Sequence, residues 1–246
     1  MDSNRKSKAI VLNRQDYREY DSLVSFYTLN FGKLTLIARG TKKIKSKLAG
    51  HIEPIALVDL MVISGKGRDY AASVISQESF SNILDDLNKL HYAGLGIRWL
   101  LRLTEENEAD PPLFLLLVDY LEVLDSYPEE ELSKEMGELI FSFFIFKFLS
   151  LIGYTPEVYN CLSCRKEIGP GNNYFNLNNG GLICESCFSK REEGTENEIL
   201  KISDNCIKLL RFMLKNEIVS SRRLKIDKKL VKEIRILTKG FLDFRS

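Results

Sequence analysis

The sequence predicts an α+β fold: a small β-barrel at the N-terminus, then an α-helical domain in which a cysteine-rich metal module is embedded. Three observations predict this arrangement. Short apolar runs separated by turn residues occupy residues 8–76. Apolar residues then recur at helical spacing from residue 79 onward. Two Cys-x-x-Cys pairs interrupt the helical part between residues 161 and 187.

The expected barrel has five short strands. Runs rich in apolar, β-branched and aromatic residues cover residues 9–12, 23–29, 34–37, 55–63 and 70–75. Turn signals separate them, and Asn30-Phe31-Gly32-Lys33 and Gly65-Lys66-Gly67 each contain glycine. Five short strands in so short a stretch are typical of a closed barrel of the OB type. We therefore expect an OB-type barrel domain over residues 1–78.

Helices are expected from residue 79 onward. The apolar side chains that predict the first helix by their spacing are Phe80, Ile83, Leu84, Leu87, Leu90 and Leu95. Asp110 followed by two prolines predicts an N-cap and the start of a second helix, because proline is well tolerated in the first helical turn.

The middle of the chain holds its most apolar segment. Pro128, followed by acidic residues 129–131, predicts a helix start, since acidic groups favour the positive end of a helix. Residues 139–152 are apolar on nearly all sides, so we expect a buried central helix that ends at Gly153. This segment is shorter than the roughly 20 apolar residues of a membrane span. The N-terminus lacks a signal-peptide pattern, so a cytoplasmic location is expected.

Two further helices are expected after the cysteines. An acidic connector at residues 192–198 precedes apolar residues at helical spacing, which are Cys206, Leu209, Leu210, Met213 and Leu214. The last helix carries Leu230, Ile234, Leu237 and Phe241 on one face, and Lys228, Lys229, Lys232, Arg235 and Lys239 largely on the other. The helical domain thus has a first part at residues 79–160 and a C-terminal part at residues 191–246, with the cysteine module at residues 161–190 between them.

The candidate metal ligands are Cys161, Cys164, Cys184 and Cys187, in two pairs with nineteen residues between them. This spacing is typical of a structural zinc site, because each two-residue gap lets a tight turn aim both thiolates at one tetrahedral ion. Four thiolates leave no open position for water, so we expect one structural Zn²⁺ ion. The alternatives are two disulfides, which a cytosolic chain disfavours, a redox-active pair or an iron–sulfur cluster. The fifth cysteine, Cys206, is expected to be buried.

Positive charge is concentrated at the two ends of the chain, although the net charge is only +1. Residues 1–50 hold eleven Lys and Arg against four Asp and Glu, and residues 201–246 hold thirteen against five. Residues 39–47, which we call the basic loop, hold five cations and no acid. A loop of this charge between two strands favours contacts with phosphates. The candidate DNA contacts are Arg14, Lys33, Arg39, Lys42, Lys43, Lys45 and Lys47.

The barrel also offers rings that could stack on bases, which are Tyr17, Tyr20, Phe26, Tyr27 and Phe31. OB-type barrels combine a cationic groove with such rings to bind single strands. We expect Phe26 and Phe31 to lie in the barrel core instead. These features favour a protein that binds single-stranded DNA. The alternative is a zinc-containing adaptor that binds protein or RNA and has no DNA-annealing activity.

Signatures of catalysis are scarce in this sequence. No phosphate-binding loop, dinucleotide-binding glycine pattern or nucleophile elbow occurs. His51-Ile52-Glu53 matches the first half of a zinc deaminase signature, but Asn160 precedes Cys161 where that signature needs proline. We therefore expect a binding protein and not an enzyme.

Four segments together resemble the RecO family of bacterial recombination mediators and DNA-repair proteins. They are residues 17–24 (YREYDSLV) with 31–33 (FGK), residues 38–43 (ARGTKK) through Glu53-Pro54, residues 151–156 (LIGYTP), and the two cysteine pairs with Tyr174-Phe175 and Gly180-Gly181-Leu182. The resemblance runs over nearly the whole chain. Two mild departures from the family pattern are Tyr20, where a small residue is common, and a short basic tail at the C-terminus.

The resemblance implies an OB barrel, a helical domain and an embedded zinc module. It also implies a DNA-binding recombination mediator in gap repair of the RecF type, which binds single- and double-stranded DNA and anneals complementary strands. Its implied protein partners are RecR, single-strand binding protein and, indirectly, RecA, which it helps to load. A cytoplasmic, nucleoid-associated location in a bacterium follows from the same resemblance.

Overall fold

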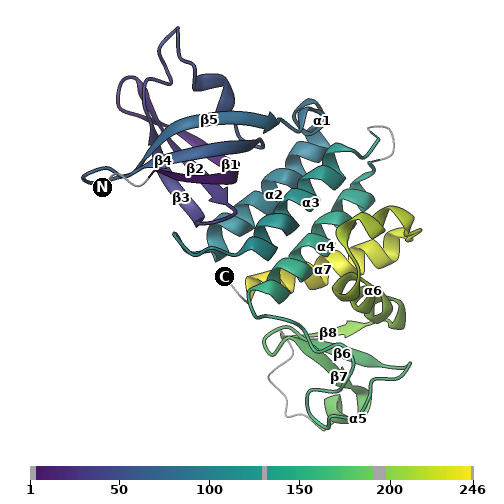
Figure 1. Ribbon diagram of the computed structural model, residues 1–246. Helices are drawn as coiled ribbons and strands as arrows, with labels where there is room; N and C mark the ends of the chain where they lie inside the picture. Colours follow the sequence, from purple (N-terminus) through teal and green to yellow (C-terminus); the bar gives the residue numbers. More distant parts are fainter. Residues whose placement is uncertain (1–3, 129–131, 191–197, 245–246) are drawn as a thin grey trace. The chain divides into compact units, whose positions relative to one another are not determined.

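The computed structural model describes residues 4–128, 132–190 and 198–244, and the chain forms two compact units (Figure 1). The first unit, Met1–Glu129, contains the barrel and three helices, and the second, Glu130–Ser246, contains the cysteine module and the remaining helices. The α-helices that directly follow the barrel in sequence, before residue 129, therefore share a unit with it. The four domain boundaries drawn on the sequence stay a prediction.

The barrel consists of β1 (Arg5–Tyr17), β2 (Asp21–Thr28), β3 (Gly32–Ala38), β4 (Leu57–Ile63) and β5 (Tyr70–Glu78). They close in the order β1-β2-β3-β5-β4, and β4 pairs back with β1. All neighbours are antiparallel except β3 and β5. The 3₁₀ helix η1 (Ala49–His51) precedes β4. The expected five-stranded barrel of the OB type is confirmed.

Alternating side chains fill the barrel, because successive residues of a strand point to opposite faces. The buried core cluster contains Ala9, Val11, Val24, Phe26, Leu34, Leu36, Ala38, Ile52, Ala56, Val58, Leu60, Val62, Ala71 and Val74. Ile10 and Tyr27 alternate with these residues and pair with each other, so they point outward, yet both are buried. Part of the outer face of the barrel is therefore covered.

The segment after α2 (Leu87–Leu103) lies against β3. The Lys33 ammonium donates to the carbonyl oxygens of Leu101, at 2.9 Å, and of Thr104. The Lys33 carbonyl in turn accepts from the N–H of Asn107 at 3.0 Å. Because orphan carbonyls at a helix end need donors, Lys33 stabilises both the helix end and its position on the barrel.

Two helices replace the single first helix that the apolar spacing predicted. Helix α1 (Ser81–Asp85) ends before α2, whose N-cap Asp86 accepts from the N–H groups of Asn88 and Lys89. Leu87, one of the apolar residues at helical spacing, lies in the first turn of α2 and is 86% exposed. Lys89 lies on the buried face of α2. Its ammonium donates to the carbonyls of Asp125, the last residue of α3 (Pro111–Asp125), and of Tyr127 just past it.

The N-terminus of α3 follows the sequence prediction. The Asp110 carboxylate accepts from the N–H of Leu113 at 2.9 Å, and prolines occupy the first turn. Pro128 was expected to begin the next helix, but residues 129–131 lie outside the described residues. Helix α4 (Lys134–Leu151) begins later, with Ser133 as N-cap, because the Ser133 hydroxyl accepts from the N–H of Met136.

Helix α4 is the central helix of the second unit, as predicted. It packs against α6 (Asp204–Lys215), η4 (Ile218–Arg223) and α7 (Lys228–Asp243). Phe146 of α4 stacks on Phe241 of α7, with ring centres 5.8 Å apart. Gly153, just past the end of α4, has φ +93°, which suits the chain reversal expected there. Among the described residues, no helix is long and apolar enough to cross a membrane.

A small sheet carries the cysteine module, in the order β7-β6-β8. Strands β6 (Asn173–Asn176) and β7 (Gly181–Cys184) pair antiparallel in the segment that leads from the first cysteine pair to the second, and the short helix α5 (Glu185–Phe188) follows. Strand β8 (Ile199–Ile202) was not predicted, and most of the acidic connector before it, residues 192–197, lies outside the described residues. Phe175 of β6 meets Phe241 edge-on at 5.7 Å, so the sheet is packed on α7.

We predict that Gly32→Ala destabilises the first unit. Gly32 has φ +66°, and a Cβ there would lie 1.9 Å from the carbonyl oxygen of Glu108. The left-handed backbone alone costs a non-glycine residue about 1–2 kcal/mol, and the clash adds to it. Urea unfolding should show a loss of at least about 2 kcal/mol. Gly67→Ala is the control, because a Cβ there meets nothing within 4 Å. Equal stability of both variants would contradict the packing described here.

Candidate nucleic-acid interface and metal centre

The basic loop packs on the β1–β2 turn at one end of the barrel. The N–H of Lys42 donates to the carbonyl of Tyr20 at 3.1 Å, and the N–H of Gly40 donates to the Asp21 carboxylate at 2.9 Å. The ammonium of Lys42 reaches the carbonyl of Arg18 at 3.2 Å. Antiparallel pairing explains why the basic loop lies next to the β1–β2 turn, because β1 and β3 both end where β2 begins. We call the β1–β2 turn and the basic loop together the barrel end.

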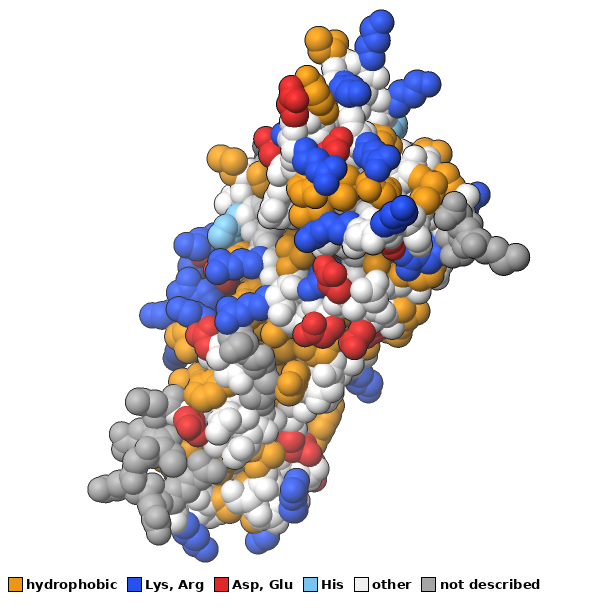
Figure 2. Space-filling view, turned by 90° about the vertical axis from the view of Figure 1, so that its left-hand side faces the viewer, with side chains coloured by type: hydrophobic (Ala, Val, Ile, Leu, Met, Phe, Trp, Pro, Cys, Tyr) orange, Lys and Arg blue, Asp and Glu red, His pale blue; other side chains and the backbone are white. Residues whose placement is uncertain are grey.

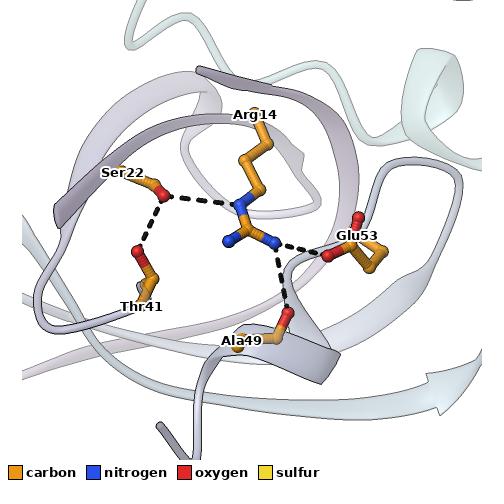
Figure 3. Close-up of polar contacts among 5 residues, drawn as sticks. All are labelled: Arg14, Ser22, Thr41, Ala49 and Glu53. Carbon is orange, nitrogen blue, oxygen red and sulfur yellow. Dashed lines mark hydrogen bonds and ion pairs between the residues drawn. The ribbon is translucent and has the colours of Figure 1, made fainter. Parts of the chain in front are cut away.

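Arg14 joins the start of the basic loop to the residues just past its end (Figure 3). Its Nε donates to the buried hydroxyl of Ser22 at 3.3 Å, and that hydroxyl bonds the buried Thr41 hydroxyl at 2.7 Å. Its Nη1 donates to the carbonyl of Ala49 at 3.4 Å and forms an ion pair with Glu53. Arg14 was predicted to contact DNA. The structure places it as the anchor of the loop, and a contact with DNA stays a prediction.

The other predicted cations differ in whether their charge has a partner within the protein. Lys33 is directed at the carbonyls of α2, away from the barrel end. Lys42 forms an ion pair with Asp16 at 3.2 Å. The guanidinium of Arg39 lies 4.0 Å from the ring centre of Tyr70, although Arg39 is exposed overall. The structure therefore does not bring all seven predicted residues to one surface.

Lys43, Lys45 and Lys47 are exposed, and none of them forms an ion pair within the part of the chain that the structure describes. Figure 2 shows Lys and Arg side chains gathered over the barrel, at the upper end of the view, with hydrophobic side chains among them. These three lysines are the part of the predicted set whose charge remains available to an anion.

The aromatic candidates also divide. Phe26 and Tyr27 are buried, so neither ring can stack on a base. Burial, helped by the charge of Asp110, raises the pKa of Tyr27. Phe31 packs against the barrel core, as expected. Tyr17 is half-buried. Tyr20, 48% exposed at the barrel end, is the most accessible of the five rings, and the ammonium of Lys43 lies 5.6 Å from its centre.

Two residues of the barrel end were missed by the sequence reasoning. Arg18 is exposed, with φ +53°, at the turn beside the basic loop. The sequence did contain a signal, because a hairpin of two strands would bring residues 18–20 to the end where the next strand finishes. Ile44 is fully exposed within the basic loop. The sequence carries no signal of this exposure, because an isoleucine is normally buried.

The four cysteines form one cluster, with their sulfur atoms within 4.8 Å of one another. The sulfurs of Cys164 and Cys184 are 3.8 Å apart. Four sulfurs at about 2.3 Å from one tetrahedral ion lie roughly 3.8 Å from each other. The N–H of Cys184 donates to the Cys161 sulfur at 3.4 Å, and such donors offset thiolate charge. The residues present therefore fit a metal ion held by four thiolates.

The thiols of this cluster influence one another. Burial would raise the pKa of Cys161, but N–H groups of Cys164, Cys184 and Ser163 outweigh burial and lower it to about 6. The pKa of Cys187 is raised, first by its contact with the sulfur of Cys184 and then by that of Cys164. A bound cation would favour the thiolate form throughout, because ligating thiols are deprotonated.

Local capping holds the first cysteine pair in place. The Glu157 carboxylate accepts from the N–H of Tyr159 at 2.8 Å and of Asn160 at 2.9 Å. Arg211 of α6 donates to the carbonyls of Val158 at 2.8 Å and Ile168 at 3.3 Å. The turn that carries Cys161 is thus fixed from both sides.

His51 and Cys206 lie outside the cysteine cluster. The Nδ1 of His51 accepts from the N–H of Ser76 at 3.3 Å, which is a structural contact within the barrel unit. Cys206 is buried, as predicted, and burial raises its pKa. The cluster of candidate metal ligands in the described residues therefore consists of the four cysteines that the spacing predicted.

We predict that Arg14→Leu loosens the basic loop. Hydrogen bonds to a charged group contribute about 1.5–3 kcal/mol each, so their loss lowers the free energy of local opening. Trypsin cleavage after Lys43, Lys45 and Lys47 should become about tenfold faster, measured by mass spectrometry under native conditions. Arg68→Leu, which removes an exposed arginine of the β4–β5 turn, should leave these rates unchanged. Unaltered cleavage in the Arg14 variant would show that the loop is anchored without it.

The amino-acid sequence matches protein families and known proteins. Residues 1–79 match the family described as Recombination protein O N terminal, and residues 84–246 match Recombination protein O C terminal. The chain is 29% identical to the DNA repair protein RecO of Dehalococcoides mccartyi, over 97% of this chain and 89% of that protein. It is 29% identical to the DNA repair protein RecO of Syntrophus aciditrophicus, over 98% and 90%. The corresponding protein of Desulforamulus reducens is 27% identical, over 97% and 88%. The two matches together cover nearly the whole chain, which therefore belongs to the RecO family.

Proposed function

We propose that this protein is a DNA-binding recombination mediator of gap repair. It binds single- and double-stranded DNA at the barrel end and anneals complementary strands. With RecR as its partner, it helps RecA to load on strands covered by single-strand binding protein. Membership of the RecO family supports these roles, because the relatives are DNA repair proteins by name. The proposed location is the bacterial cytoplasm, in association with the nucleoid.

The observation that carries the DNA-binding proposal is the set of three unpaired lysines on an anchored loop. Lys43, Lys45 and Lys47 are exposed and have no acidic partner among the described residues. Because the loop is anchored by Arg14, less conformational freedom is lost when it binds a phosphate backbone. Arg18 and Arg39, also exposed, extend the same positive surface.

Annealing at such a surface requires no acid–base chemistry. Two DNA strands repel each other through their phosphates, and cations held on a protein lower this repulsion when both strands lie close. The protein's role is then to bind and to bring strands together, and we propose no catalytic residue. Phosphate contacts carry no sequence information, which suits a protein that must act at any gap.

We also propose that the four cysteines hold one structural Zn²⁺ ion. Cys161, Cys164, Cys184 and Cys187 supply four thiolates, and the 3.8 Å sulfur separation suits tetrahedral coordination. The ion would replace a hydrophobic core in this small module, whose three strands have four residues each. It would contribute stability and no open coordination site.

We predict that the triple variant Lys43→Glu, Lys45→Glu, Lys47→Glu loses most of its affinity for single-stranded DNA. Each lysine that neutralises a phosphate contributes about 0.7 to the slope of log affinity against log salt, so this slope should fall by about 2. Fluorescence anisotropy with a labelled oligonucleotide at several salt concentrations measures both quantities. The variant should keep its melting temperature, because these side chains are exposed.

The matched control is Lys201→Glu, Lys208→Glu, Lys215→Glu, which changes the net charge equally at exposed residues of the second unit. Its affinity should fall only slightly, through the general field of the protein. Equal losses in both triple variants would remove the basic loop from the proposed interface. Tighter binding of RNA than of DNA, or no binding of either, would favour the adaptor function instead.

We predict one zinc ion per chain, measured by mass spectrometry of the purified protein. Removal with a strong chelator should lower the melting temperature, because binding of a structural zinc contributes on the order of 10 kcal/mol to the folded module. Cys164→Ser should lose the metal, whereas Cys206→Ala should retain it, since Cys206 lies outside the cluster. Iron in place of zinc, or full metal content in Cys164→Ser, would contradict the assignment.

A further inference from the structure

The tip of the basic loop combines full exposure of an apolar side chain with positive charge on both sides. The relative exposure of Ile44 is 105%, so the side chain makes no stabilising contact with the rest of the protein. Lys42 and Lys43 precede it, and Lys45 and Lys47 follow it. A large aliphatic side chain is normally buried, and its exposure here contributes nothing to folding.

Hydrogen bonds of the loop backbone hold Ile44 at the tip of the loop, with its side chain in solvent. Two tight turns follow one another, because the N–H of Lys43 donates to the Gly40 carbonyl at 3.2 Å and the N–H of Ser46 donates to the Lys43 carbonyl at 2.9 Å. Ile44 is the residue after Lys43 and so lies within the second turn. On either side, Thr41 is buried and Leu48 packs against the barrel core. The position of the tip is therefore fixed from both ends.

Tyr20 adds an aromatic face at the same barrel end. Its ring is 48% exposed, and its carbonyl accepts from the N–H of Lys42, two residues before Ile44. The ammonium of Lys43 lies 5.6 Å from the Tyr20 ring centre, within the range of a cation–π contact. Two apolar groups thus lie among cations that hold a phosphate backbone in the proposed function.

We propose that Ile44 and Tyr20 form a contact site for unpaired nucleotide bases. The proposal rests on the proposed DNA binding and adds the bases as a second ligand beside the phosphates. Charge complementarity selects this occupant. Lys43, Lys45 and Lys47, the flanking lysines without an acidic partner among the described residues, favour a polyanion that carries apolar groups next to its charges. Unstacked bases meet this description, since aromatic and aliphatic side chains stack on or wedge between them.

A duplex keeps its bases stacked inside, so the site separates unpaired from paired strands. Bases of a single strand can rest on Tyr20 and against Ile44 while the lysines hold the phosphates. Contact with a base is lost when the base pairs with its complement, and the lysines then hold a duplex by its backbone alone. The site therefore favours binding before annealing and easier release after it.

The test compares two oligonucleotides of equal length and charge, oligo-dT and an oligomer of abasic sites, by fluorescence anisotropy. The full-length protein should bind oligo-dT about tenfold more tightly. Ile44→Ser should lose part of this preference, since Tyr20 remains, and should keep the salt slope, because its lysines remain. Leu87→Ser, which removes another exposed aliphatic side chain of the first unit, should bind both oligomers as the original protein does.

A second variant reports the contact directly. In Ile44→Trp, fluorescence of the introduced indole should be quenched by oligo-dT and not by the abasic oligomer. The single native tryptophan, Trp99, supplies the background signal from the original protein. Equal binding of both oligomers by the original protein, or an unchanged preference in Ile44→Ser, would overturn the base contact while leaving phosphate binding intact. Binding of neither oligomer at low salt would instead overturn the proposed function.

Discussion

The barrel end depends on one guanidinium group. Five cations in nine residues repel one another, so the basic loop needs an anchor outside itself. Arg14 reaches the start of the loop through the hydroxyls of Ser22 and Thr41, and its end through the carbonyl of Ala49. Because Glu53 pairs with Arg14, the anchor adds no unpaired charge. The loop lysines can then point to solvent while the backbone beneath them stays in place.

Exposed cations of the β1–β2 turn and of the basic loop lie together at the barrel end. Part of the barrel's outer face is closed, since Ile10 and Tyr27 are buried there. Lys33 is directed at the carbonyl of Leu101, so its charge stabilises a helix end. At the barrel end, by contrast, exposed cations occur together with the exposed side chains of Tyr20 and Ile44. The separation of structural from available cations gives the proposed DNA site its location.

The second unit couples the cysteine cluster to the helices. The small sheet rests on α7 through the edge contact of Phe175 with Phe241, and a Cβ on Gly240 would lie 2.8 Å from Leu177. Arg211 joins α6 to the carbonyls on both sides of the first cysteine pair. If the cluster lost a bound metal, the stability of α6 and α7 would therefore also fall, because the same contacts order the helical face beneath the module.

The sequence by itself determined the five strands of the barrel, the Asp110 helix start, the four clustered cysteines and the charge of the basic loop, because each depends on local spacing or composition. It could not show that Leu87 is exposed, since the buried Lys89 sets the orientation of α2. Strand β8 was missed because its four residues are stabilised by pairing with β6. Only the tertiary structure decided the roles of Arg14 and Lys33, whose partners lie up to 39 and 71 residues away. Charge is a property of composition, but the partner of a charge is chosen by contacts between distant parts of the chain.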